Sequence, residues 1–177
     1  MRHMAFVTGP QAALSVGDEG RLIAELRNLK SQRSSRASRI NKAAQILEQT
    51  SSSRVRNAAA LALADLRATS AKDLIINVLT RSSTIGSRGT LLYALEQLRV
   101  NVPLLTLAEV IANDSYEARE EALGFIANNR FESSPDELAA SRAKLETAAV
   151  SADAERLQAI RRALENLRIK RYHNVRR

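Results

Sequence analysis

Residues 51–66 read SSSRVRNAAALALADL, and the fold prediction starts from this stretch. Three serines come first, and small or apolar residues then recur at helical spacing, with Ala59, Leu63 and Leu66 on one stripe. Residues three and four positions apart lie on the same face of an α-helix. The stretch therefore predicts an amphipathic helix that begins after a serine turn.

The same pattern occurs four times along the chain. Its arginine is Arg56 in the first copy and then Arg88, Arg119 and Arg156, at intervals of 32, 31 and 37 residues. The additional residues of the last interval fall in the polar run 128–134, which predicts a loop. A period of this length is typical of helical repeat proteins.

A second helical segment precedes each copy, so the repeating unit is a pair of helices. The apolar residues of these segments recur at helical spacing within residues 40–47, 74–79, 104–111 and 138–150. The run Ser-Pro-Asp-Glu at 134–137 predicts a helix start with a capping box. Asp114 to Glu117 is a similar start signal, and Ser70 with Asp73 is a weaker one. No segment alternates β-branched with polar residues, so no strand is expected.

A polar turn followed by Val-Arg-x-x-Ala-Ala-x-Ala-Leu resembles the HEAT-repeat family, and its short bacterial forms most closely. Residues 53–63 carry the best copy and residues 114–126 the second best. The resemblance implies an all-α fold, an α-solenoid (α-α superhelix) of about four HEAT-type helix pairs with an N-terminal capping helix. The turn aspartate of the family is kept only at Asp114 and Asp153, which puts a continuous Asp-Arg ladder between repeats in doubt.

The solenoid is predicted to span residues 18–171, with the capping helix over about 18–32. Residues 1–17 are predicted to form an irregular arm, of which residues 1–3 read as a cloning remnant before a natural start at Met4. Residues 172–177 are predicted to be a basic tail. No long apolar stretch and no cleavable leader is seen, so a cytoplasmic protein without membrane contact is expected.

The composition argues against an enzyme. Cysteine is absent and only two histidines occur, so thiolate nucleophiles, disulfides and thiolate zinc sites are excluded, and no cofactor or metal is expected. The net charge of +8 is unevenly distributed, because residues 21–56 and 156–177 are basic while 109–137 are acidic. Such a pattern suits a polar partner or self-association.

The resemblance implies that the second helix of each pair lines a concave face, where partners commonly lie. Positions one, five and nine residues after each shared arginine are predicted to point into it. The partner-binding residues selected from these twelve positions are Asn57, Leu61, Asp65, Tyr93, Gln97, Glu120, Asn128 and Arg161. Tyr93 is the preferred anchor, because an exposed aromatic side chain offers large contact area, although packing between repeats would also account for a tyrosine there. Another protein is the expected partner.

A basic cluster gives an alternative, in which the protein binds nucleic acid through counterion release. Its members are Arg27, Lys30, Arg33, Arg36, Arg39 and Lys42. The same residues are also compatible with a solvated helix junction. The four shared arginines are assigned structural roles on turn carbonyls or acids, rather than a phosphate-binding row.

Two further alternatives come from the resemblance alone. HEAT-like repeats also occur in alkylpurine DNA glycosylases and in bilin lyases, but no aromatic pocket with a carboxylate and no chromophore site is seen here.

Gly86 to Gly89 at a helix start could cradle an anion through backbone N–H groups, or it could serve close helix packing.

Overall fold

The computed structural model describes the backbone of residues 16–174 and the side chains of residues 17–168. This part of the chain is mostly helical, so the all-α prediction is confirmed. The helices are α1 (Val16–Arg27), α2 (Arg36–Gln49), α3 (Ser53–Asp65), α4 (Lys72–Leu79), α5 (Gly89–Gln97), α6 (Leu104–Asn113), α7 (Tyr116–Ala127), α8 (Pro135–Ala149) and α9 (Ala154–Asn174). Short 3₁₀ turns lie at Leu29–Ser31, Thr69–Ala71 and Ser82–Thr84.

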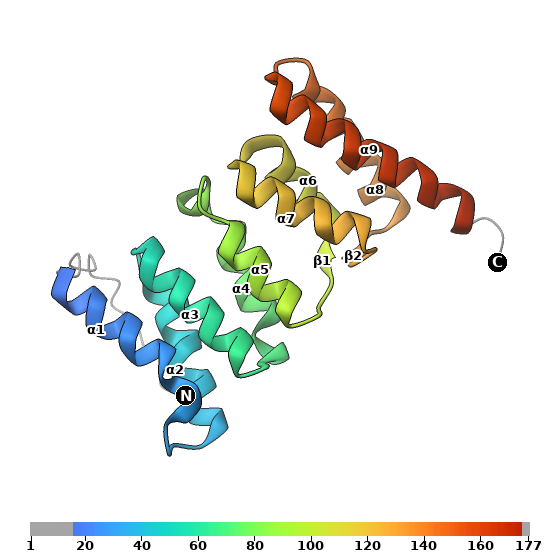
Figure 1. Ribbon diagram of the computed structural model, residues 1–177. Helices are drawn as coiled ribbons and strands as arrows, with labels where there is room; N and C mark the ends of the chain where they lie inside the picture. Colours follow the sequence, from blue (N-terminus) through green and yellow to red (C-terminus); the bar gives the residue numbers. More distant parts are fainter. Residues whose placement is uncertain (1–15, 175–177) are drawn as a thin grey trace, which may run out of the picture.

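The helices lie in two rows (Figure 1). In the odd row, formed by α1, α3, α5, α7 and α9, each helix contacts the next odd-numbered one. The even row is formed by α2, α4, α6 and α8, and α2 contacts α4 while α6 contacts α8. Consecutive helices α2 and α3, α4 and α5, α6 and α7, and α8 and α9 pack against each other across the rows. The predicted helix pairs are therefore hairpins that span both rows.

The two ends differ in detail from the sequence prediction. Helix α1 begins at Val16 and ends at Arg27, because a 3₁₀ turn at Leu29–Ser31 buries Leu29 where the helix was expected to continue. Helix α9 continues to Asn174, past the predicted limit at residue 171. The predicted arm and tail otherwise fall at residues 1–15 and 175–177, outside the described part.

Serines begin four of the helices, because a serine oxygen can accept from a backbone N–H that has no partner within the helix. Ser35, Ser52, Ser115 and Ser134 each accept from the N–H three residues later. The capping box of Ser134 and Glu137 is present as predicted. The weaker prediction at Ser70 is wrong, because α4 begins after Ala71 and has no side-chain cap.

Three odd helices end in the same way. Arg67, Arg99 and Asn129 follow α3, α5 and α7 with positive φ angles of 51°, 56° and 60°. In each case the N–H of the next residue donates to the carbonyl five residues before it, for example Ala68 to Leu63 at 2.9 Å. This is the Schellman motif, which satisfies the last carbonyls of a helix. These helix ends lie 32 and 30 residues apart, close to the intervals between the shared arginines.

The expectation of no strand is wrong at one place. Val102–Pro103 (β1) and Phe131–Glu132 (β2) form a short parallel pair, in which Val102 N–H donates to the carbonyl of Arg130 at 3.2 Å. The two segments follow α5 and α7, so the pairing joins the ends of neighbouring hairpins. A two-residue strand is too short to show the alternation by which strands are recognised in a sequence.

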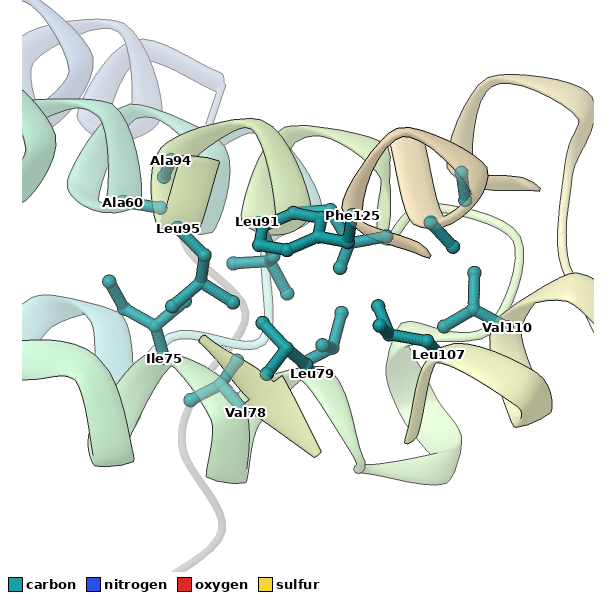
Figure 2. Packing of buried hydrophobic residues seen from close by; sticks show 14 of the residues in the cluster. Ala60, Ile75, Val78, Leu79, Leu91, Ala94, Leu95, Leu107, Val110 and Phe125 are labelled. Atoms are coloured by element: carbon teal, nitrogen blue, oxygen red, sulfur yellow. The ribbon is translucent and has the colours of Figure 1, made fainter. Parts of the chain in front are cut away.

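The core runs between the two rows. Figure 2 shows Leu91 and Leu95 of α5 in one cluster with Ile75 of α4 and Phe125 of α7. These side chains are almost fully buried, as are Leu63, Leu79, Leu104 and Leu107. Neighbouring hairpins therefore share one continuous core, and none of them has a core of its own.

Removing a large side chain from this core should destabilise the whole stack. Phe125→Ala is expected to lower the free energy of unfolding by about 3–5 kcal/mol, because it leaves a cavity between hairpins. Guanidinium chloride unfolding followed by circular dichroism measures the change. Tyr116→Ala on the same helix is the control, because Tyr116 is exposed. Equal losses in the two variants would contradict the shared core.

Candidate binding surface

The predicted partner-binding residues lie on the odd row, and four of them meet in one cavity. Leu61 and Asp65 of α3 and Tyr93 and Gln97 of α5 line this α3–α5 cavity, whose volume is about 570 Å³. Leu61 is 37% exposed and Tyr93 is 43% exposed. Each side chain therefore presents part of its surface to solvent while the rest is covered.

A second cavity lies next to the first, between α1 and α3. This α1–α3 cavity has a volume of about 530 Å³ and is lined by Asn57, Arg27 and Arg54 among others. Leu61 and Asp65 line both cavities, so α3 forms the ridge between them. Asn57 is half-buried, and its side-chain oxygen has no hydrogen-bond partner in the described part of the chain.

The other predicted residues lie outside both cavities. Glu120 of α7 is paired with Arg162 of α9 at 2.8 Å, which joins two neighbouring odd helices. Asn128 is exposed where α7 ends, and Arg161 is exposed on α9. The predicted residues thus follow the odd helices from α3 to α9, but these two cavities lie along α1, α3 and α5.

The members of the basic cluster have different partners. Arg36 donates to the carbonyls of Leu66 and Arg67 at 2.8 and 3.0 Å, which ties α2 to the end of α3. Arg39 donates to the carbonyl of Leu29 at 3.2 Å and also to that of Lys30. Lys42 pairs with Glu25.

The remaining members of the cluster are more accessible. Arg27 lines the α1–α3 cavity, Lys30 lines the α3–α5 cavity, and Arg33 is exposed. The sequence could not separate these roles, because the arginines of α2 reach carbonyls that tertiary packing brings to them.

Two charged residues of the α3–α5 cavity were missed by the sequence analysis. Arg67 and Arg99 line the α3–α5 cavity beside Lys30, and each follows an odd helix in the left-handed conformation. A signal was available, since the two arginines lie 32 residues apart, which is the interval between Arg56 and Arg88. The sequence alone gives no reason to separate them from other surface arginines.

The shared arginines have the structural role that was predicted for them. Arg56, Arg88 and Arg119 are buried, and each reaches forward to the hairpin that follows. Arg56 donates to Ser87 Oγ at 2.6 Å, Arg88 lies 3.5 Å from Asp114 Oδ2, and Arg119 pairs with Glu155. A ladder therefore links successive repeats although its acceptor changes from serine to aspartate to glutamate.

Asp114 also binds the turn that contains Gly86. Its Oδ1 accepts from the backbone N–H groups of Gly86 and Ser115 at 3.0 and 2.8 Å. The predicted anion cradle at Gly86 thus holds a carboxylate of the protein itself. Asp114 precedes the actual N-cap of α7, Ser115, so the start signal predicted at Asp114 is displaced by one residue.

Arg56 differs from Arg88 and Arg119 in this ladder, because no carboxylate pairs with it in the described residues. Burial first, and then repulsion from Arg81, lower the pKa of the Arg56 guanidinium. The charge is retained, since arginine remains protonated well above neutral pH. Ser87 is therefore the acceptor on which this buried cation depends.

Acidic side chains meet where α5 packs against α7. Burial, and after it the negative charge of Glu96 on α5, raise the pKa of Glu121 on α7. The described residues hold no cluster of three or more potential metal ligands. Among the helices in the described part, none has the length and apolar character needed to span a membrane. The described part of the odd row thus carries two cavities along α1, α3 and α5 and a pair of neighbouring carboxylates where α5 meets α7.

The fold and the surface define a class of protein, an all-helical array of repeated hairpins. Comparison of the chain with protein-family models, with curated proteins and with solved structures found no match.

Loss of the Ser87 acceptor should destabilise the repeat junction. Ser87→Ala is expected to lower the free energy of unfolding by about 1–3 kcal/mol, because a buried guanidinium N–H loses its partner. Ser83→Ala, at an exposed position of the same turn, is the matched control in denaturant unfolding. A loss no larger than that of the control would show that Ser87 does not support Arg56.

Glu121 should make stability depend on pH in a specific direction. Its raised pKa means that folding disfavours the ionised form, so Glu121→Gln is expected to stabilise the protein at neutral pH. The gain should vanish as the pH falls below the ordinary carboxyl pKa, because the glutamate is then protonated in both states. Thermal unfolding across this range measures it, with exposed Glu146→Gln as control. Destabilisation at neutral pH would contradict the assignment.

Proposed function

We propose that the protein is a non-catalytic protein-binding scaffold of HEAT type. In this proposal the two rows of helices form an α-solenoid, and the odd row is its concave binding face. Support comes from α3, α5 and α7, which share the same kind of helix end and the same buried arginine, and of which α3 and α7 also share a serine cap. In solenoids each repeat contacts mainly its neighbours, which leaves a long regular surface free for partners.

One observation carries the proposal. Leu61 and Tyr93 occupy equivalent positions in successive repeats, and both remain exposed while lining the same cavity. Asp65 and Gln97, one helical turn further on, line it as well. Equivalent positions of two repeats thus present apolar and polar groups side by side. Interfaces use such aromatic and aliphatic anchors with polar groups around them.

A nucleic-acid binder is the second candidate, since Lys30, Arg67 and Arg99 line the same cavity. Cations and an aromatic side chain are also what single-stranded nucleic acid requires. Two features disfavour it. Arg36 and Arg39 of the basic cluster are engaged with backbone carbonyls, and Asp65 lines both cavities.

Site-specific photo-crosslinking in the source cells tests the proposal. A photoreactive phenylalanine analogue at position 93 is expected to give adducts that protease digests and nuclease does not. The same analogue at position 105 is the control, because Leu105 has a similar exposure of 40% but lies on α6 in the even row. Adducts at position 105 but not 93, or nuclease-sensitive adducts at 93, would overturn the proposal.

A further inference from the structure

Two arginines at the α3–α5 cavity hold a conformation that arginine does not favour. Arg67 and Arg99 have φ angles of 51° and 56°, in the left-handed region. Glycine or asparagine normally fills such a position, and other residues lose about 1 kcal/mol or more there. The matching position after α7 is Asn129, which follows the usual preference. Asn129 lies outside the cavity, whereas both arginines line it.

The end of a helix explains part of this choice. A cation near the last carbonyls interacts favourably with the helix dipole. That interaction is equally available to a lysine or arginine in the last helical turn, where no left-handed residue is required. The left-handed position directly after the helix instead fixes where the side chain leaves the backbone. It places Arg67 and Arg99 at the ends of α3 and α5, where both line one cavity.

The charge of the cavity is unbalanced. Lys30, Arg67 and Arg99 face one acid, Asp65, across a volume of about 570 Å³. The apolar part of the lining includes Leu61 and the ring of Tyr93. Cavities of this volume are in the range that accommodates a ligand or a few side chains of a partner.

We propose that the α3–α5 cavity binds an acidic segment of a partner protein. Carboxylates of that segment pair with Arg67, Arg99 and Lys30, and one apolar side chain packs between Leu61 and Tyr93. Guanidinium groups suit this task, because they bind carboxylates through two parallel hydrogen bonds. The inference rests on the proposed scaffold function and names the chemistry of its partner.

A nucleic-acid strand fits the same cavity less well. A strand binds along a continuous positive track and stacks its bases on several aromatic rings. Here the positive lining is followed along the odd row by Glu96 and Glu121, and burial first, then the charge of Glu96, raise the pKa of Glu121. Tyr93 is the aromatic residue of the lining. A short acidic segment needs only the three cations.

Glycine substitutions separate binding from stability. Arg67→Gly and Arg99→Gly are expected to leave the free energy of unfolding unchanged or raised, because glycine suits the left-handed conformation. The probe is a fluorescent synthetic peptide of glutamates and aspartates around a central phenylalanine, titrated by anisotropy at about 150 mM salt, where long-range attraction is screened. Each variant is expected to raise the Kd about tenfold, which corresponds to about 1.4 kcal/mol.

Two controls define the result. Asn129→Gly relaxes the matching position after α7 and should leave the Kd unchanged. A peptide with lysines in place of the acids should not bind. Tyr93→Ala keeps every cation and should weaken binding of the acidic peptide, which shows that the anchor contributes in addition to charge.

Several outcomes would overturn the inference. One is an unchanged Kd in the Arg67→Gly, Arg99→Gly double variant. Another is tighter binding of an oligothymidylate of equal charge that is lost in the same variant, since the ligand would then be nucleic acid. A third is a dimer in light scattering that the double variant abolishes, since a second copy would then be the occupant. If protease-sensitive crosslinks form at position 93 and one of these results is also found, the scaffold function stands and only the acidic-segment inference fails. If those crosslinks are absent, the scaffold function and the acidic-segment inference both fail.

Discussion

Burial between neighbouring hairpins is the constraint on which the rest of this structure depends. A two-helix hairpin exposes apolar surface that only the next hairpin can cover, as Leu91 and Leu95 of α5 do with Phe125 of α7. Stacking then places the odd helices side by side. The same stacking leaves Leu61 and Tyr93 on their outer positions partly accessible.

Polar contacts at the turns keep successive hairpins in register. Three buried arginines reach forward to Ser87, Asp114 and Glu155, and Asp114 also accepts from the backbone of the preceding turn. A buried cation without an acceptor is unfavourable, so each arginine restricts how the next hairpin can be placed. The acceptor varies in chemistry and in place, since Ser87 and Glu155 directly precede the next shared arginine whereas Asp114 lies five residues before Arg119.

Much of the fold was predictable because it depends on local signals. The period of the arginine pattern gave the hairpins, and Ser134 with Glu137 gave a helix start that the structure contains. The errors lie where local signals are weak. Helix α4 begins without a side-chain cap, and β1 pairs with β2 through backbone groups of segments almost thirty residues apart.

The sequence by itself determined that the chain is helical, that its units are pairs, and that positions 61 and 93 are equivalent, because helical periodicity and repeat spacing are properties of neighbouring residues. Only the tertiary structure decided which charges remain available. Arg36 donates its hydrogen bonds to carbonyls at the end of α3, whereas Arg67 and Arg99 converge on the cavity that Tyr93 also lines. That convergence requires the stacking of two hairpins and a left-handed residue at each helix end, and neither can be read from the identity of an arginine.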